Sequence, residues 1–262
     1  MPHRPRKRFS QNFLIDETAI ADIVAAVGPR AGDRMVEIGP GLAAITRPLA
    51  QVVQPLHVVE IDRDIVARLR NDFAPERLII HEGDALDFDF AALGPDLRVV
   101  GNLPYHISTP ILFHLADCTH ALRDIHVMLQ AEVVERMTAV PGSSEYGRLS
   151  VMLQYRFDLE KVLDVSAEAF QPAPKVESAV VRMSPHPATG LRALDDKMLE
   201  QTVAMAFSQR RKTLRNTLGG VLGKSDFETL DIDPQARAQT LSVQEFVNIA
   251  DYRAGLMRPS NE

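Results

Sequence analysis

The chain has 262 residues, of which 45% are hydrophobic and 24% are charged, and its formal net charge is −6. This composition is ordinary for a globular protein, and a chain of this length buries a core without disulfide or metal staples. No apolar run approaches the roughly 18 residues of a membrane span. The basic N-terminus has no apolar segment behind it, so we expect neither a membrane anchor nor a secretory signal.

Cysteine and histidine usage bears on compartment and on metals. Cys118 is the only cysteine, so no internal disulfide can form, and a cytoplasmic location is expected. The apolar residues before it favour a small buried side chain over a reactive thiol. The eight histidines lack the paired spacing of a zinc site, so no metal is expected.

Basic residues gather in two clusters despite the negative net charge. They are Arg4, Arg6, Lys7 and Arg8 near one end of the chain, and Arg210, Arg211, Lys212 and Arg215 near the other. Local patches of this kind, more than net charge, make a nucleic-acid footprint. A basic run also fits a solvated helix face or a polar tail, so charge alone leaves both interpretations open.

The first 185 residues alternate short apolar runs with helix-like stretches. The apolar runs cover 34–38, 56–61, 78–81, 97–100, 125–129, 155–165 and 178–183. Short continuous runs rich in β-branched residues are typical of buried parallel strands, and their alternation with helices predicts repeated βαβ units. The last two runs have less helix between them, which favours an antiparallel edge.

Helix signals complete the predicted architecture. Asp62 is a candidate N-cap for a helix over 63–73, and Pro48 suits the first turn of the helix after the first strand. After the polar linker 184–190, helical patterns follow without a strand, the longest over 194–222. The sequence therefore predicts a doubly wound α/β domain over 1–185 and a small α-helical domain over 186–262.

A glycine-containing loop, Gly39-Pro40-Gly41, follows the first predicted strand. Glycines here let the backbone pass close beneath a ligand and start the next helix. The third glycine of a dinucleotide fingerprint and the Gly-Lys-Ser of a P-loop are both missing, and Pro40 lacks an amide donor. We therefore expect a ligand that carries no phosphate at this loop.

Acidic residues follow the next two strands. Glu60 ends the second strand and can accept hydrogen bonds from ribose hydroxyls, while Asp84 follows the third and can bind an adenine amine. Each carboxylate could instead cap a helix. Their positions beside the glycine loop favour an adenosine-type cofactor, because ligands collect at the carboxyl ends of strands in such sheets.

The segment Asn102-Leu103-Pro104-Tyr105 follows the fourth strand. It fits a plain turn, but it also offers what an adenine amine needs in order to react. The Asn102 side-chain oxygen and a backbone carbonyl near Leu103–Pro104 are acceptors that can direct the amine's lone pair. Pro104 stiffens the turn, and Tyr105 offers a flat face for base stacking.

These motifs, taken with three others, resemble the KsgA/RsmA family of ribosomal RNA adenine dimethyltransferases. The other segments are Gln11–Leu14, the strand-and-loop stretch Glu37–Gly41, and Phe170–Ser178, and the resemblance runs from about residue 6 to about residue 252. It implies a Rossmann-like class I methyltransferase domain that uses S-adenosyl-L-methionine, releases S-adenosyl-L-homocysteine and needs no metal. It further implies N6,N6-dimethylation of two adjacent adenosines in the 3′-terminal hairpin loop of 16S ribosomal RNA, on the immature small subunit, by a monomer.

The resemblance also implies roles for individual residues. Cofactor contacts fall on Asn12, Leu14, Gly39, Gly41, Glu60, Asp84 and Asn102. The catalytic positions are Asn102, Leu103, Pro104, Tyr105 and Phe170, with Phe170 stacking the target base against Tyr105. Beside this resemblance, the two basic clusters gain weight as RNA-contacting surfaces, and the expected RNA contacts are Arg6, Lys7, Arg8, Arg210, Arg211, Lys212 and Arg215.

Two positions depart from the family's pattern. Ala43 stands where many methyltransferases have a third glycine, and we expect its methyl group to be tolerated if the local backbone has φ below zero. His106 stands where asparagine is common, and we do not expect it to act as a general base, because the methylated amine loses its proton to water.

Three other functions remain as alternatives. A large-subunit ribosomal RNA methyltransferase of the antibiotic-resistance type would share the cofactor residues and differ in the C-terminal domain. A non-catalytic assembly or transcription factor would keep the fold without turnover. An NAD-dependent oxidoreductase is disfavoured by the missing glycine and has no use for Asn102–Tyr105.

Overall fold

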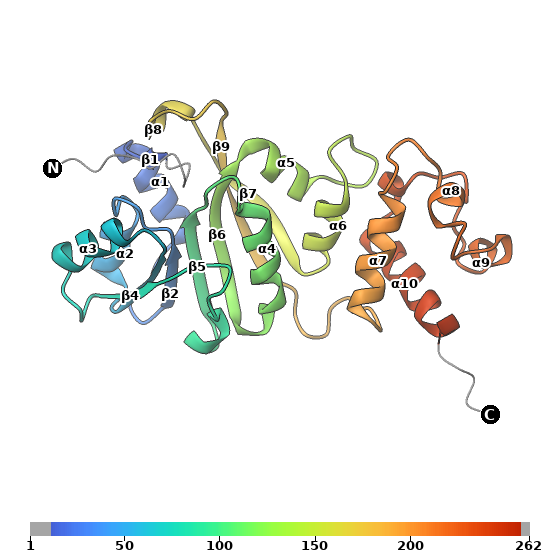
Figure 1. The fold of residues 1–262 in the computed structure, drawn as a ribbon, viewed down its shortest axis with the longest axis horizontal. Coiled ribbons are helices and arrows are strands. Elements are labelled where there is room, and N and C mark those ends of the chain that lie inside the picture. Colours follow the sequence, from blue (N-terminus) through green and yellow to red (C-terminus); the bar gives the residue numbers. More distant parts are fainter. Residues whose placement is uncertain (1–11, 258–262) are drawn as a thin grey trace. The chain divides into compact units, whose positions relative to one another are not determined.

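The structure is a computed structural model that describes residues 12–257, and these divide into two compact units (Figure 1). The first, here called the sheet unit, contains the chain up to Val134 and the segment Asp158–Pro185. The second, here called the helical unit, contains Glu135–Phe157 and the chain from His186 onward.

One stretch lies in a different unit from the one that the sequence analysis gives it. The segment 135–157 falls inside the predicted domain 1–185, but the structure groups it with the helical unit. The reason is packing: Tyr146, Val151 and Tyr155 are buried in the core of that unit, against residues that come from after His186. Nothing in the local pattern of 135–157 indicates which core it joins.

The sheet unit is built on a mostly parallel sheet with the strand order β4-β3-β2-β5-β6-β9-β7 among the described residues. The strands are β2 (Arg34–Ile38), β3 (Leu56–Glu60), β4 (Leu78–Glu82), β5 (Leu97–Asn102), β6 (Leu122–Gln130), β7 (Phe157–Val165) and β9 (Ser178–Pro185). Each overlaps a predicted strand. The first five are parallel, and β9 is antiparallel to β6. The predicted antiparallel strand is therefore present, but it lies second from the edge, and β7 is the edge strand.

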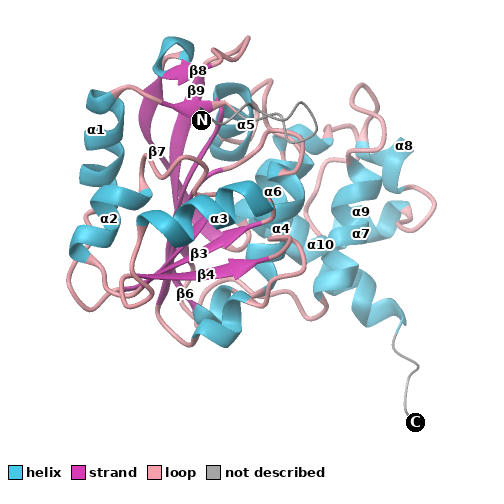
Figure 2. Cartoon of the chain, turned by 60° about the vertical axis from the view of Figure 1, so that its left-hand side comes forward, coloured by secondary structure: helices cyan, strands magenta, loops and turns pink. Residues whose placement is uncertain are grey.

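Helices follow the strands and flank the sheet (Figure 2). They are α1 (Glu17–Val27), α2 (Thr46–Val52), α3 (Arg63–Asp72) and α4 (Ser108–Asp117), with single 3₁₀ turns at Phe90–Leu93, Thr119–Ala121 and Ala167–Ala169. The predicted cap of α3 is confirmed, because the Asp62 side chain accepts a hydrogen bond of 2.9 Å from the Asp64 amide. Pro48 lies in the first turn of α2, where no intrahelical donor is needed.

A two-stranded pairing that the sequence analysis does not foresee joins β1 (Phe13–Leu14) to β8 (Phe170–Gln171). The strands are antiparallel, with Leu14 opposite Phe170. The Ile15 amide extends the pairing by donating to the Ala169 carbonyl at 2.8 Å. Two motifs from opposite ends of the sheet unit's sequence therefore lie side by side.

The helical unit contains helices and turns and, from His186 to the end of the described residues, no strand. Its helices are α6 (Arg148–Gln154), α7 (Asp196–Ala206), α8 (Leu214–Leu218), α9 (Lys224–Thr229) and α10 (Val243–Met257), with a 3₁₀ turn at Ala238–Thr240, and α5 (Ala131–Thr138) joins it to the sheet unit. Ser242 caps α10 through the Glu245 amide. Within the described part of the chain, no helix is both long and apolar enough to cross a membrane.

The long helix predicted over 194–222 is interrupted. Residues 207–213 form turns between α7 and α8. The polar run after Phe207 offers no apolar side chain for the core, and the first amides of α8, at Leu214 and Arg215, donate to the carbonyls of Ala236 and Pro234. The basic residues of this region therefore lie mainly on a turn, and the prediction of a single basic helix is wrong.

Candidate functional site

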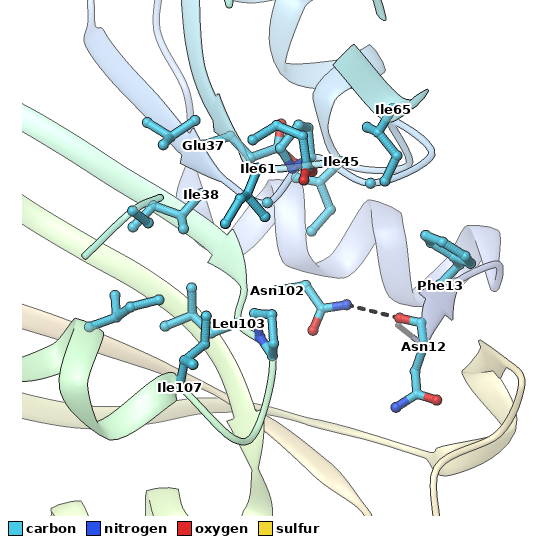
Figure 3. Close-up of a pocket in the computed structure, with 18 of the residues that line it drawn as sticks. Asn12, Phe13, Glu37, Ile38, Ile45, Ile61, Ile65, Asn102, Leu103 and Ile107 are labelled. Atoms are coloured by element: carbon cyan, nitrogen blue, oxygen red, sulfur yellow. Dashed lines mark hydrogen bonds between the residues drawn. The ribbon is translucent and has the colours of Figure 1, made fainter. Parts of the chain in front are cut away.

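The sheet unit contains a cavity of about 320 Å³ at the carboxyl ends of β2, β3, β4 and β5 (Figure 3). The residues assigned to the cofactor by resemblance all line it: Asn12, Leu14, Gly39, Gly41, Glu60, Asp84 and Asn102. The turn that follows β5 lines it too, through Leu103, Pro104, Tyr105 and His106. One cavity thus brings together the residues predicted for the cofactor and the turn predicted for the amine.

Parallel pairing places these residues at one edge. Ile38 at the end of β2 lies opposite Val59 in β3 and Gly101 in β5, and Glu60 lies opposite Glu82 in β4. The segments that leave these strands therefore start at the same level of the sheet.

The glycine loop is shaped by its backbone conformation. Gly39 and Gly41 have φ values of 69° and 52°, in the left-handed region that favours glycine. A Cβ atom on Gly41 would lie 3.4 Å from the Phe13 ring, so a side chain here would press on the segment that covers the cavity. The loop therefore passes close to Phe13, and its predicted approach to a ligand stays a prediction.

Ala43 does not have the expected backbone conformation. Its φ is +67°, not negative, and its side chain is 1% exposed. A left-handed conformation costs a residue with a Cβ about 1–2 kcal/mol. Burial of the Ala43 methyl in the core contributes about 0.8 kcal/mol in the opposite direction and so offsets part of this cost.

Neither Glu60 nor Asp84 caps a helix, because Asp62 is the N-cap of α3 and a turn follows Asp84. Glu60 Oε1 accepts a hydrogen bond of 2.8 Å from the Asp62 amide, and Asp84 Oδ1 accepts one of 2.9 Å from the Leu86 amide. Each carboxylate therefore uses one oxygen in a local turn and still lines the cavity. Burial raises the pKa of Glu60, and the amides of Asp62 and Gly41 oppose that rise.

Glu37, the acidic residue before the glycine loop, lines the cavity but is not among the predicted site residues. It is 2% exposed, and its Oε2 atom has no hydrogen-bond partner among residues 12–257. Burial, reinforced by the negative charge of Glu60 and opposed by Thr46, raises its pKa to about 7. A glutamate inside an otherwise apolar strand is the sequence signal that could have identified it.

The cavity wall is acidic and apolar. Glu37, Glu60 and Asp84 line it, and no lysine or arginine of the described residues does. Isoleucines that the sequence analysis leaves out supply apolar surface: Ile38, Ile45, Ile61, Ile65, Ile107 and Ile111. A wall of this kind suits a cationic ligand with hydroxyl groups and an apolar body, and it opposes a phosphate.

The turn after β5 holds the Asn102 amide in one orientation. Its Nδ2 atom donates to the Asn12 carbonyl at 3.4 Å (Figure 3), and no donor among residues 12–257 reaches Oδ1. The Leu103 amide donates to the Met128 carbonyl at 3.2 Å, and the Ile107 amide donates to Pro104 at 3.1 Å. The turn is thus fastened to the sheet while the Asn102 oxygen remains an open acceptor.

Phe170 and His106 differ in their surroundings. The Phe170 side chain is 3% exposed, packs in the core of the sheet unit, and does not line the cavity. The backbone of Phe170 in β8 pairs with Leu14 and so supports β1, the segment at the cavity. The predicted stacking on a base needs an exposed ring face, which the buried Phe170 ring does not present. His106 lines the cavity and is exposed to solvent.

The basic cluster of the helical unit is exposed on the turn between α7 and α8 and at the start of α8. Its residues are Arg210, Arg211, Lys212 and Arg215. An Arg210 Nη atom donates to the Ser144 carbonyl at 2.5 Å. Within residues 12–257 none of the four forms a salt bridge, so their charges remain available to a polyanion. Arg6, Lys7 and Arg8 lie outside the described residues.

Two further expectations from the sequence concern the Cys118 thiol and metal ligands. Cys118 caps the end of α4, is half-buried, and has a pKa raised to about 11 by burial and by the charge of Asp117. Its thiol is therefore protonated at neutral pH. No group of three or more potential ligand side chains suited to a metal ion occurs in residues 12–257.

A doubly wound sheet with an antiparallel β9, and a cavity over the ends of its central parallel strands, defines the Rossmann-like class of methyltransferase folds. Two solved structures share it. A dimethyladenosine transferase from Plasmodium falciparum superposes with a TM-score of 0.79 and 24% identity, over 90% of this chain and 95% of its own. The 23S rRNA methyltransferase ErmE superposes with a TM-score of 0.74 and 23% identity, over 93% of this chain and 100% of its own.

The chain belongs to the ribosomal RNA adenine dimethylase family, whose model matches residues 2–254. Among its relatives is the ribosomal RNA small subunit methyltransferase A of Nitrosospira multiformis, 58% identical over 96% of this chain and 97% of the relative. The protein of the same name from Laribacter hongkongensis is 59% identical over 95% of this chain and 96% of the relative.

The strain at Ala43 can be measured by substitution. Ala43→Gly removes the backbone strain, which stabilises the fold by about 1–2 kcal/mol. It also loses the buried methyl group, which costs about 0.8 kcal/mol, and gives the unfolded chain more conformational entropy, which costs about 0.5–1 kcal/mol. We expect the free energy of unfolding in urea to change by less than about 1 kcal/mol. Ala43→Val places a β-branched residue at positive φ and should cost about 2–3 kcal/mol. A valine variant as stable as the wild type would contradict the left-handed backbone.

The buried Glu37 predicts a pH dependence of stability. Its pKa of about 7 lies above the value of 4.5 in the unfolded chain, so between these pH values the folded state binds the extra proton. Stability from this group is therefore present below pH 4.5 and lost as pH rises through 7. Glutamine does not titrate, so Glu37→Gln should not lose stability as the pH rises. Relative to the wild type, the variant should become more stable by up to about 3 kcal/mol as the pH rises from 4.5 to 7. Urea denaturation at a series of pH values tests this, and a difference that stays flat counts against it.

Proposed function

We propose that this protein is an S-adenosyl-L-methionine-dependent methyltransferase that dimethylates the N6 amines of two adjacent adenosines in the 3′-terminal hairpin loop of 16S ribosomal RNA. It would act in the cytoplasm, as a monomer, late in assembly of the small ribosomal subunit. The observation that carries the proposal is the Asn102–Tyr105 turn, whose open acceptor and aromatic ring line the same cavity as three carboxylates.

The cavity fits this cofactor. An orphaned buried oxygen on Glu37 and the absence of lysine and arginine from the described lining suit a ligand with a sulfonium and an ammonium group. Glu60 would hold the ribose hydroxyls, Asp84 the adenine amine, and Glu37 would face the positive charge. Gly39 and Gly41 would let the backbone run beneath the cofactor. When bound, the cofactor supplies a methyl group on positively charged sulfur.

The residues of the turn position and activate the substrate amine. The amide orientation set by the Asn12 carbonyl leaves Asn102 Oδ1 to accept one N–H of the amine. A carbonyl near Leu103–Pro104 would accept the other, so that the lone pair points along the line of displacement. Tyr105 would stack on the flipped base, since an amine inside a duplex cannot be reached. Positioning of this kind supplies much of the rate.

The relatives support the small-subunit substrate over a large-subunit one. Both relatives named above bear the name of a small-subunit methyltransferase and match at close to 60% identity across nearly their whole length, whereas ErmE matches at 23%. The exposed basic turn of the helical unit would neutralise phosphates of the folded RNA. Phe170 as a second stacking surface stays a prediction, because it requires the ring to leave the core.

The decisive experiment transfers labelled methyl groups from S-adenosyl-L-methionine to small subunits that lack the modification, and then maps the modified base. We expect two adjacent dimethyladenosines in the terminal hairpin loop of 16S RNA. Label on large-subunit RNA, on cytosine or on protein would each overturn the proposed substrate. Tight binding to small subunits without any transfer would favour the non-catalytic alternative.

The roles of the turn predict a large loss of turnover. Combined replacement Asn102→Ala and Tyr105→Ala removes the acceptor and the stacking surface, and kcat should fall by at least about a hundredfold. His106→Asn is the neighbouring control, and it should leave kcat within about threefold because no proton transfer is assigned to His106. Wild-type activity in the double variant would refute the assigned chemistry, and a hundredfold loss in His106→Asn would make His106 a participant.

The basic turn predicts a change in RNA affinity and in its salt dependence. Charge reversal by Arg210→Glu with Arg211→Glu should raise the KM for the RNA substrate and lower the slope of log affinity against log salt by about 2. Lys197→Glu with Lys224→Glu is the matched control, since it changes net charge equally on other surfaces of the helical unit. Equal effects in the two variants would mean that only net charge matters.

A further inference from the structure

A hydrogen bond of 2.8 Å joins the Tyr105 hydroxyl to the Ser178 hydroxyl. Tyr105 lies on the turn that follows β5 and lines the cavity, whereas Ser178 is the first residue of β9. The bond therefore links the turn after β5 to the start of β9, two segments that are far apart in the chain. Neither segment indicates the contact by itself.

Ser178 is a rigid anchor. It is 1% exposed and lies opposite Gln130 at the start of the antiparallel β6–β9 pairing. The residue before it is also fixed, because the Glu177 carbonyl accepts a hydrogen bond of 2.9 Å from the Ala131 amide. Tyr105 is the only partner of the Ser178 hydroxyl among residues 12–257.

The tyrosine hydroxyl has no role in stacking itself. A base stacks on the face of an aromatic ring, and a phenylalanine ring presents such a face as well. The hydroxyl oxygen is the side-chain atom farthest from the backbone, so a hydrogen bond made there restricts both side-chain torsions. The backbone end is held separately, because Ser108 Oγ donates to the Tyr105 carbonyl at 3.0 Å. The two bonds fix the ring at both ends.

We propose that Ser178 is a positioning residue that holds the Tyr105 ring at the cavity in the orientation that receives the target adenine. The inference rests on the proposed function and deepens it, because it explains why a tyrosine and a buried serine occur together. Without the Ser178 bond, the ring must be ordered each time a base enters, and that loss of freedom lowers the effective affinity for the transition state.

The first test is a double-mutant cycle on small subunits that lack the modification. Ser178→Ala and Tyr105→Phe should each lower kcat/KM for the RNA substrate by about three- to tenfold. The KM for the methyl donor should stay unchanged. The double variant should be no worse than either single variant, because all three lack the same bond. Additive losses, or wild-type kcat/KM in Ser178→Ala, would overturn the proposal.

A matched control separates positioning from loss of stability. Ser150→Ala also removes a completely buried serine hydroxyl, one that donates to the Arg136 carbonyl in the helical unit. We expect it to reduce stability to a degree similar to Ser178→Ala and to leave kcat/KM for RNA unchanged. An equal loss of kcat/KM in Ser150→Ala would show that Ser178 acts only through stability.

A spectroscopic readout is independent of turnover. The chain has four tyrosines, so selective ¹³C labelling of their rings gives a resolvable spectrum, in which Tyr105→Phe identifies the Tyr105 signal. Ser178→Ala should shift or broaden that signal, and Ser150→Ala should not. An unchanged Tyr105 signal in Ser178→Ala would refute the anchor.

The outcomes also separate this inference from the proposed function. If the wild type methylates no adenine, the proposed function fails, while the ring spectrum still decides whether Ser178 holds Tyr105. If the wild type is active and Ser178→Ala lowers kcat/KM for the RNA substrate while Ser150→Ala does not, the positioning role stands. If Ser178→Ala does not fold, Tyr105→Phe carries the test, since it keeps Ser178 and removes the bond, and wild-type kcat/KM in that variant overturns the proposal.

Discussion

The parallel pairing of β2 with β3 and β5, and of β3 with β4, is the constraint on which the rest of the structure depends. Strands that run in one direction end at one edge, and the segments that leave them are brought together whatever their distance in sequence. The glycine loop, Glu60, Asp84 and Asn102 become neighbours for this reason alone. The cavity is therefore a consequence of topology, and its chemistry is set by the residue that happens to end each strand.

The cavity and the loop beside it contain groups that work against stability. Glu37 is buried without a partner for one carboxylate oxygen, and Ala43 holds a left-handed backbone. Such features persist where the surrounding structure over-determines them, and they cluster at functional sites. Here the apolar core beneath the loop, which includes Leu49 and Val58, supplies that support. The energetic cost of Glu37 is offset when a cation occupies the cavity, and this links stability to ligand binding.

Two long-range contacts orient side chains that line the cavity. The β1–β8 pairing holds the segment at Asn12 over the cavity, where its carbonyl orients the Asn102 amide. The bond between Ser178 and Tyr105 orients the aromatic ring. The first contact joins the two ends of the sheet unit's sequence and the second joins its middle to its last strand, so the turn after β5 is adjusted by segments outside the βαβ repeats. The basic turn lies in the helical unit and carries exposed positive charge.

The sequence by itself determined the strands of the sheet, the capped helix after Asp62, the helical character of the residues after His186, and part of the cavity lining, namely the glycine loop, Glu60, Asp84 and the Asn102–Tyr105 turn. These features are encoded locally, because β-branched apolar runs, capping residues and glycine pairs act on their own neighbourhood. Only the tertiary structure decided the positive φ of Ala43, the burial of Glu37 and Phe170, the break of the helix before Leu214, and the transfer of residues 135–157 to the helical unit. Each of these depends on contacts between segments far apart in the chain, and a local pattern carries no information about which distant surface a residue will meet.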